Sequence, residues 1–418
     1  MSLRSGLPRD DERAGAGAGE TDELPQLVVA VLGAVNHGKT RLVASLSQLL
    51  ATRGWARALE PEALDQQACE RERGLTVELS HAVVRTAERR YTLIDCPGHR
   101  DYLKNALTGV AEADAALLVV DVEAGPDEAT RELALLAHHM GLETAVVFLS
   151  HADEGGDPEY RALVEADTRA LLAACGYDAD ATRLIQGSAL RAALALDAGE
   201  APESAPELRP LWRLVEALDA LPGQARADES RPPIMAVSDV IGHPEHGVVI
   251  TGRLERGALL LEQEIELFGA SAESPMRHPV RRMWSRHREV ERAVAGELVG
   301  VALPWLQGHP GLRRGLVLGV PGALETQGAL DVRLLTLSPE LGERRYVGLH
   351  GGVDFHVFLR TAEVSARIQR PAPGFVRSGG EHRCTLALAR PIVALPGWSL
   401  ALCEPERTVA LGRIASTG

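Results

Sequence analysis

Apolar runs alternate with amphipathic segments from residue 27 to about residue 221. The first run, residues 27–32, reads LVVAVL, and such an uninterrupted apolar stretch is typical of a strand buried on both faces. After a short polar segment, Leu42, Val43, Leu46 and Leu49 recur at helical spacing. This alternation predicts an α/β domain with a doubly wound, mostly parallel sheet. Further strands are expected at residues 77–84, 91–95, 115–121, 145–149 and 183–186, and further helices at 102–111, 129–140, 158–174 and 208–220.

The pattern changes after residues 221–223, Leu-Pro-Gly. From Arg231 onward, short apolar stretches are separated by Gly and Pro turns about every ten residues, which is typical of all-β structure. A second Pro-Gly break lies at residues 321–322. The sequence therefore predicts a first domain at residues 25–222 and two all-β barrel domains at 229–322 and 323–418. Residues 1–24 carry charges and an AGAGAG stretch without an apolar core, and we expect a disordered tail there.

Composition narrows the class of protein. The chain has 418 residues, 45% of them hydrophobic, which is enough for two or three separate cores. No apolar run approaches the ~20 residues of a membrane-spanning helix, so no membrane partner is expected. The five cysteines lack the spacing of a metal site or a disulfide framework, and a cytoplasmic protein is expected.

The charge of the chain limits its partners. A net charge of −14 argues against indiscriminate nucleic-acid binding over the whole surface. The net charge does not exclude a local basic face. Such a face is predicted at residues 277–288, where five arginines and two histidines surround Trp284. The alternative for this segment is a solvated hairpin or loop.

The polar segment after the first strand carries the clearest chemistry. Residues 33–40 read GAVNHGKT and fit the phosphate-loop pattern G-x-x-x-x-G-K-[ST] between a strand and a helix. Gly33 and Gly38 would let backbone N–H groups point at phosphate oxygens, and the helix that follows adds its positive end. Lys39 would reach the β- and γ-phosphates and the Thr40 hydroxyl would ligate Mg²⁺. A glycine turn that only joins strand and helix is the alternative.

Residues further along fit a metal and phosphate site. Asp95 ends a predicted strand, where its carboxylate can approach the Mg²⁺ shell through a water. Gly98 can turn its N–H toward a γ-phosphate, and the Thr76 hydroxyl could complete the metal shell. The chain also has only two lysines, Lys39 and Lys104, among 44 basic side chains. Each retained lysine is expected where a compact ammonium group is needed rather than a planar guanidinium group.

Three segments together resemble the translational GTPases, most closely the bacterial elongation factor Tu group. They are GAVNHGKT at 33–40, ERERGLT at 70–76 and DCPGHRDYLKN at 95–105. Segments at 247–257, 295–303 and 313–322 resemble the second domain of that family, and residues 355–368 resemble the third. The resemblance implies a GTPase domain followed by two β-barrels, with GTP or GDP and Mg²⁺ as ligands.

The resemblance also implies roles for single residues. Thr76 would be the first-switch threonine that holds Mg²⁺ in the triphosphate state. His99 would position the attacking water, so the catalytic set is His99, Lys39 and Thr76, with Val35 and Leu75 as an apolar gate. Lys104, Asn105 and Arg314 match positions that hold the 5′ end of an aminoacyl-tRNA.

The guanine-reading segment departs from the family pattern N-K-x-D. Here it reads Ser150-His151-Ala152-Asp153, in which Asp153 keeps the carboxylate that pairs with guanine. Ser150 is shorter than the usual asparagine, and His151 replaces the lysine that packs along the base. The last base-contacting loop is kept as Ser188, Ala189 and Leu190. We expect guanine specificity with weaker affinity.

Two further departures affect ligand predictions. Asn36 stands where the family has an aspartate, and it resembles the asparagine of potassium-activated GTPases, so K⁺ is a candidate ligand. With His37, it completes the predicted nucleotide loop. Leu298 replaces an asparagine near the pocket for the aminoacyl end, which puts ordinary aminoacyl recognition in question.

The sequence therefore predicts a GTPase that carries aminoacyl-tRNA to the ribosome in translation elongation. The alternative is a divergent paralogue with weakened nucleotide specificity that acts as a tRNA- or protein-binding regulatory module. A factor specialised for one unusual tRNA is a third hypothesis, although such relatives usually carry an additional C-terminal domain and this chain ends at Gly418. The sequence leaves open which tRNA or partner is bound and whether a nucleotide exchange factor is needed.

Overall fold

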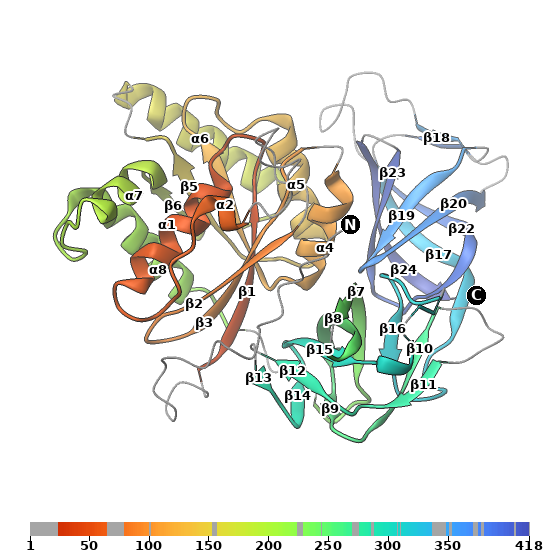
Figure 1. Ribbon diagram of the computed structural model, residues 1–418. Helices are drawn as coiled ribbons and strands as arrows, with labels where there is room; N and C mark the ends of the chain where they lie inside the picture. Colours follow the sequence, from red (N-terminus) through yellow and green to blue (C-terminus); the bar gives the residue numbers. More distant parts are fainter. Residues whose placement is uncertain are drawn as a thin grey trace. The chain divides into compact units, whose positions relative to one another are not determined.

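The computed structural model shows two compact units, residues 24–223 and 224–418, each taken here by itself (Figure 1). It describes residues 24–64, 79–99, 102–152, 157–223, 229–243, 245–269, 276–285, 288–306, 308–309, 311–336, 348–350, 353–370, 375–377, 380–404 and 407–417. The predicted tail therefore lies almost entirely outside the described residues. No helix within those ranges is both long and apolar enough to cross a membrane.

The first unit is built on a six-stranded sheet in the order β2-β3-β1-β4-β5-β6. Its strands are β1 Gln26–Leu32, β2 Ser80–Arg85, β3 Arg90–Asp95, β4 Ala115–Asp121, β5 Ala145–Ser150 and β6 Arg183–Gln186. β2 runs antiparallel to β3, while β3, β1, β4, β5 and β6 pair in parallel. The prediction of a doubly wound, mostly parallel sheet is confirmed.

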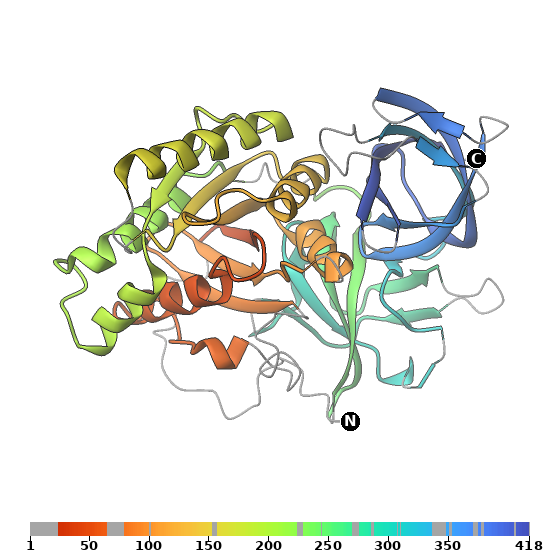
Figure 2. The same cartoon turned by 90° about the horizontal axis from the view of Figure 1, so that it is seen from above.

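Helices cover both faces of this sheet (Figure 2). They are α1 Lys39–Ala51, α2 Pro61–Leu64, α4 Leu103–Glu112, α5 Glu128–His139, α6 Pro158–Cys175, α7 Ala189–Asp197 and α8 Arg209–Asp219, with a 3₁₀ turn η2 at Pro206–Leu208. The predicted helices at 102–111, 129–140, 158–174 and 208–220 correspond to α4, α5, α6 and α8. Helix α7 was not predicted, because its buried positions are alanines, which give only a weak amphipathic pattern.

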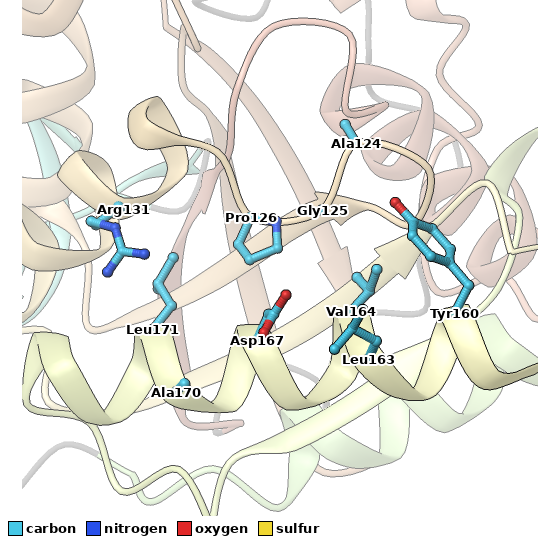
Figure 3. Close-up of a pocket in the computed structure, with 10 residues that line it drawn as sticks. All are labelled: Ala124, Gly125, Pro126, Arg131, Tyr160, Leu163, Val164, Asp167, Ala170 and Leu171. Carbon is cyan, nitrogen blue, oxygen red and sulfur yellow. The ribbon is translucent and has the colours of Figure 1, made fainter.

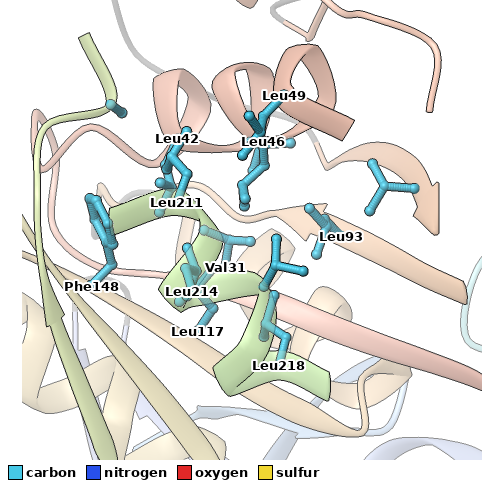
Figure 4. Packing of buried hydrophobic residues seen from close by; sticks show 14 of the residues in the cluster. Val31, Leu42, Leu46, Leu49, Leu93, Leu117, Phe148, Leu211, Leu214 and Leu218 are labelled. Carbon is cyan, nitrogen blue, oxygen red and sulfur yellow. The ribbon is translucent and has the colours of Figure 1, made fainter. Parts of the chain in front are cut away.

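One apolar core fixes helix α1 on the sheet, and with it the direction of the loop between β1 and α1. In Figure 4, leucines of α1 and α8 meet side chains of the sheet: Leu42, Leu46, Leu49, Leu211, Leu214, Leu218, Val31, Leu93, Leu117 and Phe148. All of these side chains are at most 3% exposed. Complete burial of such a side chain contributes about 1.5–3 kcal/mol, so the core anchors both ends of the loop.

The second unit contains only strands and one short 3₁₀ turn, η3 at Pro304–Leu306, among its described residues. An eight-stranded sheet has the order β11-β10-β16-β7-β8-β15-β12-β13, and β14 pairs with β9 beside it. These strands are β7 Ile234–His243, β8 Gly247–Arg256, β9 Ala258–Leu260, β10 Glu264–Phe268, β11 Met276–Pro279, β12 Met283–Ser285, β13 Arg288–Glu289, β14 Arg292–Val294, β15 Leu298–Ala302 and β16 Val317–Gly319.

A closed six-stranded barrel follows, in the order β17-β22-β20-β19-β23-β24. Its strands are β17 Thr326–Thr336, β19 Phe355–Leu359, β20 Ala362–Arg370, β22 Gly380–Val393, β23 Ser399–Glu404 and β24 Arg407–Thr417, and β18 Gly348–His350 pairs with β21 Phe375–Arg377. An α/β domain followed by β-rich domains is thus confirmed as the fold class. The division at residue 322 falls between β16 and β17, and the separate domain boundaries remain a prediction.

The two β regions share a packed seam. Ile234, Phe268 and Val317 of the first region belong to the same buried cluster as the interior of the barrel. Arg360 Nε lies 3.3 Å from Glu255 Oε1, and the Arg360 guanidinium lies 5.1 Å from the centroid of Trp398. Burial raises the pKa of Glu255, against the opposing effect of Arg360.

Candidate functional site

The phosphate loop passes directly against the backbone of strand β4. A Cβ added to Gly33 would lie only 2.2 Å from the Val119 carbonyl oxygen, so a side chain at this position would collide with the strand. Gly38 caps helix α1 with φ +84°, in the left-handed region that favours glycine. The His37 ring donates from Nδ1 to the same Val119 carbonyl over 3.2 Å. These contacts hold residues 33–38 as a tight turn at the start of α1.

Lys39 lies under this turn. Its side chain is 6% exposed, and its Nζ donates to the Ala34 carbonyl over 2.8 Å. Burial lowers the pKa of Lys39, while the carboxylate of Asp95 opposes that shift. The buried Lys39 ammonium group has little contact with water. This favours hydrogen bonds from the ammonium group to phosphate oxygens.

The first turn of α1 and the end of β3 meet at two oxygen-bearing side chains. The Thr40 hydroxyl donates to Asp95 Oδ2 over 2.6 Å, and Asp95 is completely buried. A hydroxyl and a carboxylate are hard oxygen ligands of the kind that Mg²⁺ takes beside nucleotide phosphates. The residues present therefore fit the predicted Mg²⁺ site. The third predicted member, Thr76, lies outside the described residues, as does Leu75 of the apolar gate.

The segment after β3 lies against the phosphate loop. A Cβ on Gly98 would be 2.5 Å from the Gly33 carbonyl oxygen and 2.6 Å from Lys39 Nζ. Only glycine fits this close approach. His99 follows, half-buried, with its ring 5.9 Å from the ring of Tyr102 and tilted by 53°. The segment that carries the predicted water-positioning histidine is thus held next to the predicted phosphate site.

Ser150 joins the predicted base-reading segment to the phosphate loop, and His151 joins it to the end of β4. The buried Ser150 hydroxyl donates to the His37 carbonyl over 2.8 Å, so this short side chain reaches the loop backbone. His151 has φ +56°, and its Nδ1 pairs with Asp121 Oδ2 at 3.0 Å. The Ala152 N–H donates to the Gly187 carbonyl over 3.3 Å, which links this segment to the next loop. Asp153 lies outside the described residues.

The loop before α7 carries the remaining predicted base contacts. The Ser188 hydroxyl accepts from the Arg191 N–H over 3.2 Å and caps the helix. The Ala189 carbonyl accepts from the buried Ser45 hydroxyl over 2.9 Å, which ties α7 to α1. Leu190 is 49% exposed. The sequence-predicted nucleotide residues that the structure describes are therefore contributed by the loops after β1, β3, β5 and β6.

The predicted tRNA residues are distributed over both units. Asn105 lies half-buried on α4, and Lys104 belongs to the same helix, although its side chain and Asp101 are outside the description. Arg314 lies just before β16, and its Nε donates to the Thr361 carbonyl over 3.3 Å. That contact holds Arg314 at the seam between the two β regions.

Three arginines of the predicted basic face at residues 277–288 form ion pairs with glutamates. Arg277 pairs with Glu266 at 3.0 Å, and Arg282 pairs with Glu289 at 2.8 Å. Arg281 pairs in the same way with Glu262. The ion pairs of these three arginines favour the solvated hairpin or loop, since each positive charge lies beside a carboxylate.

A cavity of about 430 Å³ lies elsewhere in the first unit (Figure 3). It is lined by the loop after β4, by Arg131 of α5 and by one face of α6, from Tyr160 to Leu171. The Tyr160 hydroxyl donates to the Glu123 carbonyl over 2.8 Å at its edge. None of its lining residues belongs to the predicted nucleotide site.

Sequence reasoning missed Asp121. This residue ends β4 and stands in register with Ser150 of the neighbouring parallel strand β5. Polar residues at the carboxyl ends of parallel strands gather at one edge of the sheet, which is where ligands bind in this architecture. The end of a predicted strand at residue 121 was therefore the signal that could have identified it.

Comparison with known proteins agrees with this geometry. Residues 25–222 match the family model of the elongation factor Tu GTP binding domain. The chain is similar to the crystal structure of a bacterial selenocysteine-specific elongation factor, EF-Sec, with a TM-score of 0.71 over 94% of this chain. The two are 20% identical, which shows a shared fold, and this chain spans 58% of that protein's length. Residues 25–222, just under half of the chain, are therefore identified as a GTP binding domain of the elongation factor Tu family.

Proposed function

We propose that this chain binds GTP and Mg²⁺, hydrolyses GTP to GDP and phosphate, and carries aminoacyl-tRNA to the ribosome. The proposal rests on one observation: four groups lie together at one turn of the phosphate loop. The Lys39 ammonium, the Thr40 hydroxyl, the Asp95 carboxylate and the Gly98 backbone all meet there.

In this proposal the chain supplies position and charge rather than covalent chemistry. Lys39 and the N–H groups of residues 33–38 bind the β- and γ-phosphates. Mg²⁺, when bound, would neutralise charge that builds on those phosphates, held by the Thr40 hydroxyl and Thr76 with Asp95 behind them. His99 orients a water for in-line attack, and Gly98 lets its loop respond to the γ-phosphate.

The base would be read by Asp153, with Ser188, Ala189 and Leu190 on the neighbouring loop. The Ser150 contact with the His37 carbonyl supports a structural role for residue 150, because it ties the base segment to the phosphate loop. We therefore propose that the site is specific for guanine. Its affinity for GTP should be lower than that of a site with the usual asparagine and lysine.

A hydrolysis assay tests the proposed activity. Wild-type protein should release phosphate from GTP slowly and only with Mg²⁺. His99→Ala should bind GTP nearly as well and turn it over more slowly, because His99 acts only when water attacks. Turnover that is unchanged in His99→Ala would overturn the proposed role.

We also propose K⁺ dependence through Asn36. Asn36 is exposed with φ +65°, and its side-chain oxygen could help to hold a monovalent cation beside the phosphates, where charge develops in the transition state. Hydrolysis should be faster in K⁺ than in Na⁺ at equal ionic strength. Equal rates in the two salts would contradict this role.

Lys104, Asn105 and Arg314 are proposed to hold the 5′ end of a tRNA. Phosphate contacts by two cations release counterions, so affinity should fall steeply with salt. Lys104→Ala and Arg314→Ala should each weaken binding and reduce the salt slope by about one unit. Gel-shift titration of tRNA at two salt concentrations measures both effects.

The second candidate function is a tRNA- or protein-binding regulatory module. The changes at Ser150, His151 and Leu298 favour it, because they alter base reading and the aminoacyl pocket. If wild type and both variants bind tRNA equally, or none binds, the carrier proposal fails and the protein-binding module takes its place.

A further inference from the structure

Three arginines stand side by side on the outer face of the closed barrel. Arg333 of β17 lies directly opposite Arg383 of β22 and, on its other side, directly opposite Arg413 of β24. All three residues are exposed. Val332 and Leu334, the chain neighbours of Arg333, are at most 1% exposed and belong to the core inside the barrel. Since successive side chains of a strand point to opposite faces, the three arginines form one outward-facing row, named here the arginine row.

The arginine row places like charges next to one another. Like charges directly opposite each other on neighbouring strands destabilise a sheet. Within the described part of the chain, none of the three guanidinium groups forms an ion pair or a hydrogen bond. By contrast, Arg367 on β20 of the same barrel donates two hydrogen bonds to Asp354, over 2.6 and 2.9 Å. The barrel thus keeps three neighbouring positive charges without a carboxylate partner among these residues.

Two acidic residues border the row but do not pair with it. On one side, Asp331 Oδ1 accepts from the Thr385 hydroxyl over 2.7 Å, and its Oδ2 accepts from the Ser416 hydroxyl over 3.4 Å. On the other side, Glu381 lies one position further along the strand pairing of β17 with β22. The Asp331 carboxylate is therefore bound by hydroxyl groups, and the arginine row stays available for an anion from outside the chain.

The length of the row matches a phosphate backbone. Neighbouring strands lie about 4.8 Å apart, so three arginines on adjacent strands span about 10 Å. One strand of a nucleic acid carries a charge about every 3.4 Å along its axis, so the row covers about three phosphates. A guanidinium group can donate two parallel hydrogen bonds to one phosphate, which favours arginine over lysine at such contacts.

We propose that the arginine row binds the phosphate backbone of a nucleic-acid strand. The charge of bound phosphates offsets the repulsion among the three arginines, in a chain whose net charge is −14. A protein partner is disfavoured because charged residues are depleted at the centre of protein–protein interfaces, whereas nucleic-acid interfaces are polar and positive. The proposal does not rest on the 5′-end contacts proposed above, which involve other residues.

The test is a fluorescence anisotropy titration of the full chain with a labelled RNA of about 20 nucleotides, at several salt concentrations. DNA of the same sequence and polyglutamate of the same charge serve as competitors. The variants are Arg333→Gln, Arg383→Gln and Arg413→Gln, a triple variant with all three changes, and a triple variant with lysine at the three positions. Arg367→Gln is the matched control, because it removes the same charge from the same barrel.

Each single variant should bind the RNA about threefold more weakly, as for one exposed charge contact. Each should also reduce the salt slope by about 0.7. The triple glutamine variant should lose at least about tenfold in affinity, whereas the triple lysine variant should retain more because the charges remain. Arg367→Gln should bind like wild type, and DNA should compete with the RNA because the row contacts phosphates rather than bases.

The melting temperature of the unbound protein separates binding from folding. Single glutamine variants should melt at the wild-type temperature or above it at low salt, because repulsion between like charges is relieved. A lower melting temperature would assign the row a structural role and overturn the inference. Equal RNA binding by wild type and the triple glutamine variant, or no binding by wild type, would overturn it as well. Displacement of the RNA by polyglutamate as readily as by DNA would overturn it in favour of an acidic protein partner.

Discussion

The Thr40 hydroxyl donates a 2.6 Å hydrogen bond to Asp95 Oδ2 and thereby joins the first turn of α1 to the end of β3. Asp95 is completely buried, and its charge also acts on Lys39, whose pKa burial would otherwise lower further. The same carboxylate thus supports the predicted metal ligand and the predicted phosphate-binding ammonium.

Replacing Asp95 with asparagine keeps the shape and a hydrogen-bond acceptor but removes the charge. We expect the Mg²⁺ concentration needed for half-maximal GTP binding to rise about 10- to 100-fold, the usual cost of losing a partner of a metal ligand. Titration of Mg²⁺ at fixed labelled GTP measures this midpoint. Asp197→Asn, on the exposed end of α7, is the control. A midpoint equal to that of wild type in Asp95→Asn would contradict the account.

Gly98 is expected to tolerate no side chain. The Cβ of Gly98→Ala would lie 2.5 Å from the Gly33 carbonyl oxygen and 2.6 Å from Lys39 Nζ, so one of the two loops must move. We expect weaker nucleotide binding and slower hydrolysis. Gly223→Ala is the matched control, because among the described residues its Cβ would come within 4 Å of Arg89 alone, at 3.9 Å. Nucleotide affinity in Gly98→Ala that equals the affinity in the control would rule out the close packing of the two loops.

Ser150→Ala should loosen the phosphate loop. The substitution removes a buried donor from the His37 carbonyl, which costs about 1–3 kcal/mol when the acceptor stays unsatisfied. Hydrogen exchange at the amides of residues 33–40 should accelerate accordingly in the protein without nucleotide. Ser150→Thr keeps the hydroxyl and is expected to retain more protection. Unchanged exchange in Ser150→Ala would show that this hydrogen bond does not stabilise the loop.

Burial of His37 should make the first unit less stable in acid. Its pKa is lowered from the ordinary value of 6.5, so the folded protein binds fewer protons at this site than the unfolded chain. Stability from this group is therefore present above pH 6.5 and is lost as the pH falls below it. Denaturation of nucleotide-free protein between pH 5.5 and 7.5 should show a shallower pH slope in His37→Gln. Equal slopes would contradict a buried neutral ring.

Local sequence signals predicted the strand, loop and helix that carry the candidate site, and β1 and α1 form there. The apolar run 27–32 and the pattern at 33–40 were sufficient because both features are continuous in the chain. Helix α7 escaped prediction because alanines fill its buried face, and α2 is only one turn long.

Pairings between distant residues were harder to anticipate. Asp121 faces His151 only because β4 and β5 pair in the register that sets Asp121 beside Ser150. Likewise, Arg277 forms an ion pair with Glu266, and Arg282 forms one with Glu289. The first of these pairs joins β11 to β10. Strand register is set by tertiary packing, so a linear pattern of charges could not decide whether that face was basic.

The central claim is that residues 33–40 form a guanine nucleotide site. Equilibrium binding of labelled GTP, GDP, ATP and XTP to wild type and Lys39→Ala, with Mg²⁺ present, tests it most directly. We expect wild type to bind GTP and GDP and to discriminate against ATP and XTP, and Lys39→Ala to lose binding because the phosphates lose their buried ammonium. Failure of wild type to bind GTP or GDP, or equal binding by Lys39→Ala, would contradict the account.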